Sequence, residues 1–450
     1  MATEGRRDCS VCIRLSSTAA YGYNACGLPV SVKYQMEDGT FMQETLSYDN
    51  MGRITASLRE GSSPALTRSA EDTYDSVGRL LSCKEGNATE SYGYDVLGNR
   101  VLKQLDGANK ATYQYNALNQ LVNRTEDGVQ YSYGYDRRGN LIQERRGEVQ
   151  THQYTYDATN HMTLGKKLEN GTQTEYAYNA LYMRIKNIQT IAGEDGFRTR
   201  EVSCLPDFLS RTDNELMAYE KGKYSLRTVF GRGYERLAGT AAVEAEAAGA
   251  EAVTAEAVEK MYFQPDFYGS PLFASNGQGQ VLRYAERGIW GELKQPVDSG
   301  LNESGLEESL RFTSYGFDSV IGKHFAKARF YDSGQGRMLA VDPVKRGLNG
   351  YSYCDSDPVN YTDPTGEIFN ILAGGGAGAI AGAVVGGVFG FGGSALSQIL
   401  SGEDFNAREA FGAAANGAIV GGVRGALIGS GVGAGAALAA DFGAGTLGSA

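Results

Sequence analysis

Two aspartates that stand directly before prolines are the residues of this chain best suited to chemistry. Asp342-Pro343 and Asp363-Pro364 lie 21 residues apart, and the second belongs to the tetrapeptide D-P-T-G. Two carboxylates brought close together cannot both ionise easily, so one stays protonated as an acid while the other activates water. The alternative is that both only cap turns, as aspartate before proline often does. A third unit, Asp357-Pro358, competes for the same interpretation.

The rest of the chain offers little other chemistry. His152, His161 and His324 lie in strand-like sequence without a nucleophile arranged beside them, so packed or surface histidines are expected. Cys9 and Cys12 have the spacing of one pair of metal ligands, but structural zinc takes four ligands and no second pair is near. No glycine loop with the pattern of a phosphate-binding site is present. We therefore expect neither a metal nor a cofactor.

The charge of the chain excludes one class of partner. Its formal net charge is -11 over 450 residues, and it contains no long run of lysine or arginine. Phosphate neutralisation needs clustered cations, so no nucleic-acid partner is expected for the body of the protein. The first 17 residues lack the apolar core of a secretory signal. If the protein is exported, either the chain is a fragment or its route needs no such signal.

A tyrosine followed by Asp or Asn recurs through the first half of the chain. The spacing is about 21 residues, and tyrosine (28 residues) and glycine (61) are both abundant. The best copies read YDNMGRI from residue 48, YDSVGRL from 74, YDVLGNRV from 94 and YDRRGNL from 135. The eight repeat tyrosines are Tyr23, Tyr48, Tyr74, Tyr94, Tyr115, Tyr135, Tyr156 and Tyr178.

Each position of this repeat has a physical interpretation. Asp or Asn accepts a hydrogen bond from the backbone two residues on and opens a turn, while the glycine three residues later takes a positive φ without a Cβ penalty. Upstream tyrosines alternate, as at Tyr131, Tyr133 and Tyr135, which indicates one face of a strand. Second turn signals, LDG at 105–107 and EDG at 126–128, close each unit. The sequence therefore predicts stacked antiparallel hairpins, with an ordinary β-sandwich as the alternative.

The Y-D-x-x-G-R-L unit resembles the YD repeats of bacterial Rhs and wall-associated proteins, of the C subunits of Tc insecticidal toxins and of animal teneurins. The resemblance covers residues 20–185 and implies an all-β fold, in which hairpin repeats spiral into part of a hollow shell. Residues 262–292 resemble the "DHxGSP" strand pair of the Rhs family, with Phe267 in place of the usual histidine. Residues 310–366 resemble the Rhs-associated core domain, which implies a plug that closes one end of the shell and precedes a variable cargo.

The resemblance also implies an activity for the aspartate pair. In relatives it is an aspartyl autoprotease that cuts just after the second motif and leaves the cargo inside the shell. Carried over by position, the catalytic residues are Asp342, Asp363 and Arg329, whose guanidinium would hold the ionised carboxylate. This chain departs from the family at Lys345, where relatives have glycine, at Glu367, where an apolar residue is common, and in a spacing one residue short.

After Gly366 the composition changes, and residues 368–400 contain no charged side chain. Glycines recur every fourth residue from Gly378 to Gly390 and from Gly417 to Gly433, with a polar link at 401–411. On a helix this spacing makes the small-residue face of a glycine zipper, so an α-helical Gly/Ala-rich hairpin is expected. Its arms are long enough to insert as transmembrane helices, although Arg424 disfavours a permanent span; the alternative is a Gly/Ala spacer.

These observations divide the chain and define two functions from different classes. The first is the shell and delivery body of a bacterial polymorphic toxin, secreted or at the cell surface, whose partners are its own C-terminal cargo and a target-cell membrane. No toxin enzyme is visible in residues 434–450, so the cargo is taken to be absent and an autoprotease is the only enzyme expected. The second is a wall-associated adhesion protein whose exposed tyrosines bind glycans. The expected parts are an N-terminal extension (1–20), YD repeats (21–239), an Ala/Glu-rich insertion (240–260), the Rhs-associated core domain (261–366) and the glycine-zipper segment (367–450).

Overall fold

The computed structural model describes residues 9–11, 17–36, 39–193, 196–206, 215–220, 224–228, 233–236, 259–276, 278–285, 287–292, 294, 312–344, 348–367 and 370–371. Within them, 24 strands form one large sheet, and each strand pairs antiparallel with the next along the chain. The strands are β1 (Cys9–Val11), β2 (Ser17–Tyr23), β3 (Pro29–Met36), β4 (Phe41–Tyr48), β5 (Ile54–Gly61), β6 (Arg68–Tyr74), β7 (Leu80–Glu85), β8 (Ala88–Tyr94), β9 (Arg100–Leu105), β10 (Ala108–Tyr115), β11 (Leu121–Glu126), β12 (Val129–Tyr135), β13 (Leu141–Arg146), β14 (Val149–Tyr156), β15 (Met162–Lys167), β16 (Gln173–Tyr178), β17 (Arg184–Gly193), β18 (Gly196–Pro206), β19 (Glu215–Glu220), β20 (Tyr224–Thr228), β21 (Gly233–Arg236), β22 (Glu259–Pro265), β23 (Pro271–Asn276) and β24 (Val281–Tyr284).

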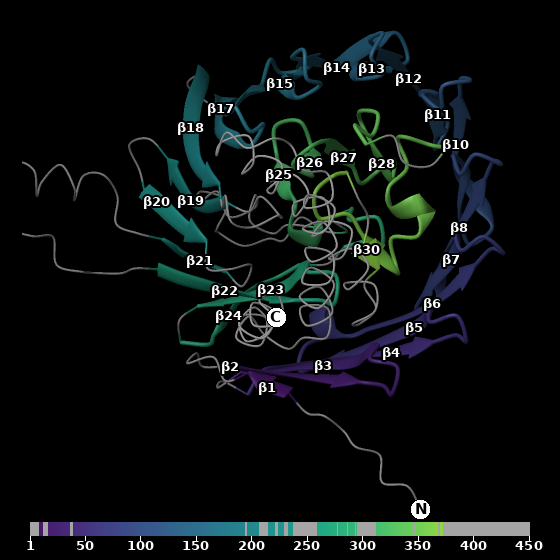
Figure 1. Ribbon diagram of the computed structural model, residues 1–450, viewed down its shortest axis with the longest axis vertical. Coiled ribbons are helices and arrows are strands. Elements are labelled where there is room, and N and C mark those ends of the chain that lie inside the picture. The colour runs from purple at the N-terminus through teal and green to yellow at the C-terminus, as the bar shows by residue number, and fades with distance from the viewer. Residues whose placement is uncertain are drawn as a thin grey trace, which may run out of the picture.

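The sheet curves until its last strands reach its first ones (Figure 1). The hydroxyl of Tyr34 on β3 donates to the carbonyl of Pro265 at the end of β22 over 3.0 Å. The Tyr34 ring also packs edge-on against Phe273 of β23, with centroids 6.1 Å apart. Apolar residues from both ends, including Met42, Leu66 of the 3₁₀ turn η1 (Pro64–Leu66) and Leu272, form one buried cluster. The predicted all-β shell of antiparallel hairpins is thereby confirmed.

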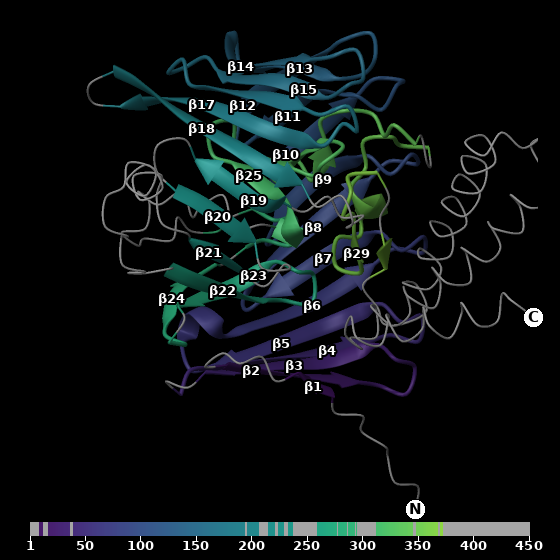
Figure 2. The same ribbon diagram turned by 60° about the vertical axis from the view of Figure 1, so that its left-hand side comes forward.

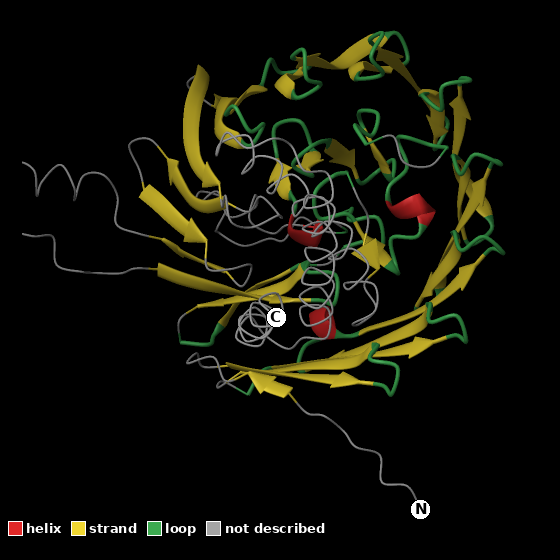
Figure 3. Ribbon diagram, viewed as in Figure 1, coloured by secondary structure: helices red, strands yellow, loops and turns green. Residues whose placement is uncertain are grey.

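Strands dominate the part of the chain that the structure describes, with only short helical turns (Figure 3). None of its helices has the length and apolarity to cross a membrane. The predicted Gly/Ala-rich helical hairpin falls on residues that, beyond 371, lie outside the described ranges.

Each repeat turns a corner through one aspartate or asparagine. In the corner after β4, Oδ1 of Asp49 accepts hydrogen bonds from the backbone N–H groups of Met51 (2.8 Å) and Arg53 (2.9 Å). The Gly52 N–H donates to the Asp49 carbonyl, and Gly52 has a φ of 78°, as predicted for this position. The same pair of bonds recurs at Asn24, Asp75, Asp95, Asn116, Asp136, Asp157, Asn179, Asp266 and Asn276.

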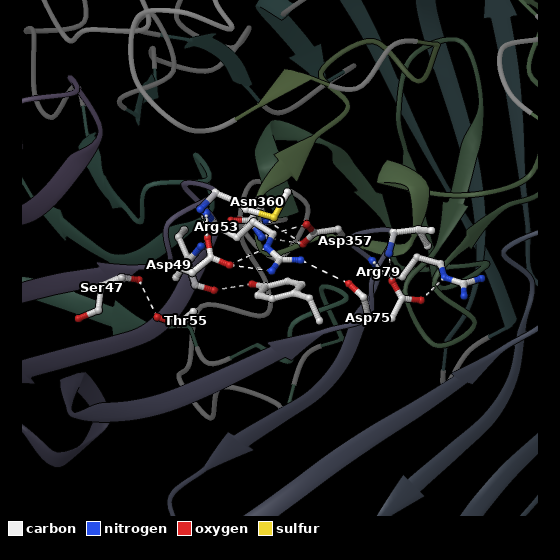
Figure 4. A network of polar contacts seen from close by, with 12 residues as sticks. Ser47, Asp49, Arg53, Thr55, Asp75, Arg79, Asp357 and Asn360 are labelled. Atoms are coloured by element: carbon white, nitrogen blue, oxygen red, sulfur yellow. Dashed lines mark hydrogen bonds and ion pairs between the residues drawn. The ribbon is translucent and has the colours of Figure 1, made fainter.

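Neighbouring corners are joined to one another. The guanidinium of Arg53 bonds its own Asp49 and also donates to the carbonyl of Asp75 in the next corner (Figure 4). Arg79 repeats this arrangement, with Nε 2.6 Å from Asp75 and Nη1 2.7 Å from the Asp95 carbonyl. The corners therefore form a continuous rim along one edge of the sheet, which we call the corner rim.

The tyrosine before a corner contacts the previous repeat through its hydroxyl group. The Tyr74 hydroxyl donates to the Ile54 carbonyl over 2.5 Å, and Tyr94 donates to the Leu80 carbonyl over 2.8 Å. The Arg53 guanidinium also lies 4.9 Å from the centre of the Tyr74 ring, a cation–π contact. Tyr74 and Tyr94 thus make a hydrogen bond to the preceding repeat that phenylalanine could not make. Equivalent hydroxyl bonds are made by Tyr48, Tyr115 and Tyr178.

Residues 312–366 form a plug on the concave side of the sheet (Figures 1 and 2). It contains a four-stranded sheet and two 3₁₀ turns, and its end pairs with the residues that follow. These elements are η4 (Phe312–Ser314), β25 (Gly316–Asp318), β26 (Lys323–Phe325), β27 (Phe330–Asp332), β28 (Arg337–Met338), η5 (Cys354–Ser356), β29 (Tyr361–Thr362) and β30 (Asn370–Ile371). Of the 262–292 region, β22, β23 and β24 continue the large sheet, whereas Trp290 packs against the plug and its carbonyl accepts from the Tyr331 hydroxyl.

The plug runs along the sheet in the direction opposite to the repeats. Its first strand contacts a late repeat and its last turn contacts an early one, so the two chain directions are antiparallel. The contacts that trace this path are Tyr176 to Asp318 (2.6 Å), Tyr351 to the Gly139 carbonyl (2.7 Å), Asn119 to the Leu348 carbonyl (2.9 Å), Ser356 to the Gly98 carbonyl (3.2 Å) and the Ile54 N–H to Asn360 Oδ1 (2.8 Å).

The corner carboxylate is expected to stabilise the shell measurably. Asp75→Ala removes both backbone bonds and the Arg79 ion pair, so the free energy of unfolding should fall by about 1–3 kcal/mol. Asp75→Asn keeps the Oδ1 acceptor and loses only a partly exposed ion pair, so its loss should stay below about 1 kcal/mol. Urea unfolding followed by circular dichroism measures both. Equal losses for the two variants would contradict the importance of the acceptor.

A buried carboxyl in the plug is expected to make stability depend on pH. Burial raises the pKa of Asp357 to about 7, although Asn360 donates to both its oxygens. The folded state therefore holds a proton that the unfolded chain releases near pH 4, so this contribution is present at acidic pH and is lost as pH rises through 7. Asp357→Asn should flatten the decline between pH 5 and 8 by on the order of 1–3 kcal/mol. Urea titrations at pH 5 and pH 8 measure the free energy of unfolding. A decline as large in Asp357→Asn as in the wild type would refute the role of Asp357.

Candidate functional site

The plug brings the three sequence-predicted site residues together. Arg329 stands at the start of β27, Asp342 follows β28, and Asp363 follows β29. Nη2 of Arg329 lies 3.5 Å from Oδ2 of Asp363 and 4.0 Å from Oδ2 of Asp342. All three residues are almost fully buried, with 5, 7 and 3 % of Arg329, Asp342 and Asp363 exposed. A guanidinium between two carboxylates is the arrangement that would hold one of them ionised.

Each carboxylate is also held by the backbone. Oδ1 of Asp342 accepts the Val344 N–H over 2.8 Å, and the Asp342 N–H donates to the Gly350 carbonyl over 2.8 Å. Arg329 Nη1 donates to the same Gly350 carbonyl over 3.0 Å, which ties the first aspartate loop to the arginine. Lys345, one of the departures from the family pattern, lies outside the described residues.

Asp363 organises the D-P-T-G loop as a corner of the repeat type. Its Oδ1 accepts the N–H groups of Thr365 (3.4 Å), Gly366 (2.9 Å) and Glu367 (3.1 Å). Oδ2 is left facing Arg329. The turn-capping role weighed for Asp363 is therefore present, and it coexists with a contact to the arginine.

Four successive carbonyl groups of this loop are each bound by a donor from elsewhere in the plug. The hydroxyl of Tyr315 donates to the Asp363 carbonyl, Lys327 Nζ to Pro364 (2.8 Å), the Ala328 N–H to Thr365 (3.1 Å) and Arg329 Nε to Gly366. Burial, and after it the charge of Asp363, raises the pKa of Tyr315 well above its ordinary value, so its phenol remains a donor. We call these four contacts the carbonyl clamp.

The clamp fixes both sides of one peptide bond. The Gly366 carbonyl accepts from Arg329, while the Glu367 N–H donates to Asp363 over 3.1 Å. A donor on the carbonyl oxygen polarises the carbon, and an acid beside the nitrogen can protonate a leaving amine. The Gly366–Glu367 bond thus has a donor on its carbonyl oxygen and a carboxylate beside its nitrogen.

A cavity of about 430 Å³ lies beside this bond. From the plug it is lined by Arg329, Thr365 and Glu367, and from the sheet by His161 and Tyr182 among others. The rings of His161 and Tyr182 stack with centroids 5.1 Å apart and form one part of the wall. The cavity is large enough to hold water beside Arg329 and Glu367, and the shell supplies part of its lining.

Other candidates from the sequence lie apart from this site. Asp357 bonds Asn360, which in turn accepts the Ile54 N–H from the shell, so this third Asp-Pro unit anchors the plug. Tyr315 and Lys327 were missed, because a tyrosine and a lysine without a local motif give no sequence signal for a contact made through folding.

Comparisons with known proteins agree with the geometry of the shell. Residues 12–190 match the family described as the teneurin YD-shell. The chain is 30 % identical over 139 residues to the double-stranded DNA deaminase toxin A of Burkholderia cenocepacia, covering 30 % of this chain and 10 % of that protein. It is 25 % identical over 115 residues to the tRNA nuclease WapA of Bacillus subtilis, covering 24 % and 5 %.

Among solved structures, TcdB2-TccC3 without its hypervariable C-terminal region is similar, with a TM-score of 0.39 and 16 % identity. That comparison covers 78 % of this chain and 20 % of the other. The chain thus spans about a tenth or less of the curated relatives and about a fifth of that solved chain. The resemblance to YD-repeat proteins of the Rhs kind is confirmed by the family match and the relatives.

The conformation of Gly366 provides a structural test of the loop. A Cβ at this position would lie 2.2 Å from the Ala326 carbonyl oxygen, and the φ of 74° disfavours other residues. Gly366→Ala should therefore displace the D-P-T-G loop and cost about 1–3 kcal/mol of stability. Gly334→Ala is the matched control, because its Cβ would meet only the Asp332 carboxylate at 3.3 Å. Thermal unfolding compares the two, and equal melting temperatures would contradict the close packing at Gly366.

Proposed function

We propose that this chain, a YD-repeat shell protein of the Rhs type, is the body of a bacterial polymorphic toxin that encloses a C-terminal cargo segment. The relatives support this assignment, since the similar proteins are named as a DNA deaminase toxin and a tRNA nuclease. The plug supports it as well, because it lies on the concave side of the sheet and its chain continues toward the C-terminus (Figure 1). A secreted or surface location follows from such a role.

The observation that carries the mechanism is the carbonyl clamp around residues 363–366. We propose that the chain cuts itself between Gly366 and Glu367. Ionised Asp342 takes a proton from water, whose oxygen attacks the Gly366 carbonyl carbon, and Arg329 Nε stabilises the negative charge that forms on the oxygen. Protonated Asp363 gives its proton to the Glu367 nitrogen, and the C–N bond breaks to leave a Glu367 amine and a Gly366 carboxylic acid, which returns a proton to Asp363 and becomes a carboxylate.

The assignment of the two aspartates follows from distance. Oδ1 of Asp363 is 3.1 Å from the Glu367 nitrogen, within reach of the leaving group. Asp342 reaches the loop only from the other side of Arg329, 4.0 Å from its Nη2. The guanidinium is shared between the carboxylates, so it favours a state with one negative charge on the pair.

The glycan-binding alternative gains no support from the tyrosines. Those facing inward from the repeats, Tyr92, Tyr113, Tyr133, Tyr154 and Tyr176, are buried in the packing between sheet and plug and are not available on a surface. Membrane insertion of residues 367–450 also has no support among the described residues and stays a prediction.

Intact mass spectrometry of the purified full chain tests the cleavage. The expected result is a body ending at Gly366 and a fragment beginning at Glu367. Asp342→Asn and Asp363→Asn should each abolish the cut, and Asn at 363 keeps the oxygen that accepts the loop N–H groups. Asp355→Asn is the matched control, because Asp355 has a φ of 48° that asparagine tolerates and it is not part of the clamp. A wild-type chain that stays whole sinks the proposal.

A further inference from the structure

The corner rim presents apolar side chains to solvent. The residue two positions after the corner aspartate or asparagine donates its N–H to that side chain and points its own side chain outward. In successive corners this residue is Met51, Val77, Leu97 and Leu118. Met51 is 79 % exposed, Val77 74 % and Leu118 70 %. In each of these four corners, the three residues that follow the corner aspartate or asparagine are uncharged.

These four corners form one continuous surface, which we call the apolar row. Arg53 joins the first corner to the second and Arg79 the second to the third, as Figure 4 shows for the first two. Asn99 joins the third to the fourth through Asn119, 2.8 Å away. Each repeat adds two strands spaced about 4.8 Å apart, so the row is roughly 30 Å long. The plug extends it with Leu348, which is 80 % exposed and whose carbonyl accepts from Asn119.

The shell itself does not require apolar residues at these positions. The next two corners have Arg138 and Thr159 there and make the same backbone bonds to Asp136 and Asp157. Apolar side chains at these positions therefore do not stabilise the turn, and their exposure to water is unfavourable. A row of exposed apolar side chains, about 10 Å apart from one repeat to the next, offers anchor points that another apolar segment can cover.

We propose that the charge-free segment 372–400 of this same chain docks along the apolar row. The structure delivers the chain to the correct end of it. Asn360 accepts a hydrogen bond from Ile54, which follows the Asp49 corner directly. The next residues form β29, which pairs with β30, and β30 ends at Ile371. Residue 372 therefore starts beside the Met51 end of the row. The segment carries Ile, Val, Phe and Leu among its glycines and alanines and no charge.

The length of the segment fits the surface. Its 29 residues would span about 44 Å as a helix and roughly 100 Å when extended, so it can cover a row of about 30 Å in either form. Because the segment is attached a few residues from the row, its effective concentration there exceeds that of any free partner. Docking does not depend on the proposed cut, and after such a cut it would retain the released fragment on the shell.

Limited proteolysis of the full chain with elastase, which cuts after small residues, tests the docking. The row variant is Val77→Lys with Leu118→Lys, and the matched control is Val149→Lys with Phe197→Lys, two exposed apolar residues on strands that meet the opposite rim. Fragments are identified by mass spectrometry, and thermal unfolding verifies that both variants fold. Cleavage within 372–400 should be at least about tenfold faster in the row variant than in the wild type or the control.

Three results would overturn the inference. The first is equal cleavage rates in the row variant and the wild type. The second is protection that vanishes when the wild type is diluted from micromolar to nanomolar concentration, which would assign the row to a second copy of the chain. The third is protection that arises only after phosphatidylcholine vesicles are added, which would assign the segment to a membrane. The first and third results are independent of whether the Gly366–Glu367 bond is cut, and the dilution series is run on the Asp342→Asn variant, in which the segment stays attached.

Discussion

A single side-chain oxygen that accepts two backbone N–H groups shapes the corner rim along the part of the chain that the structure describes. In the described residues it recurs at ten corners, from Asn24 to Asn276. It satisfies two donors in a turn where no strand can bond them, and it fixes where the next strand begins. Desolvation opposes ionisation of Asp75, but hydrogen bonds from Arg79 and Val77 outweigh it and lower the pKa of this carboxyl. The charge on Asp75 is thereby retained to bind Arg79, and Arg79 carries the register to the next corner.

The plug depends on that regularity. It bonds backbone carbonyl and N–H groups at every second corner, at Gly139, Gly98 and Ile54, and such groups stand at the right spacing only when the corners are in register. Its own path runs opposite to the repeats, so residues far apart in sequence become neighbours. The contacts of Arg329 with the two aspartates lie within the plug, whereas part of the neighbouring cavity is lined by the shell residues His161 and Tyr182.

Local sequence patterns predicted the turns, because the conformation of a turn depends on a few neighbouring residues. The Tyr-Asp-x-x-Gly unit predicted the hairpins and their positive-φ glycines, and in weaker copies Asn119 takes the same conformation at a φ of 59°. Two further corners, at Asp266 and Asn276, fall outside this repeat pattern because Pro265 and Ser275 precede them instead of tyrosine. The grouping of Asp342, Asp363 and Arg329 was anticipated through resemblance, whereas the other clamp donors depend on tertiary contacts that no local pattern encodes.

The D-P-T-G loop is best understood as one more corner of the repeat, altered at two points. Like Asp49, Asp363 accepts the N–H four residues on, and like Gly52, Gly366 has a positive φ. An ordinary corner holds that N–H but provides neither a cation on the glycine carbonyl nor a second carboxylate. Here Arg329 places its cation on the Gly366 carbonyl, and Asp342 provides the second carboxylate beside the same guanidinium. In the proposed cleavage, turn capping and acid catalysis would therefore not compete for Asp363, because the cap holds the Glu367 nitrogen beside the carboxyl group that would protonate it.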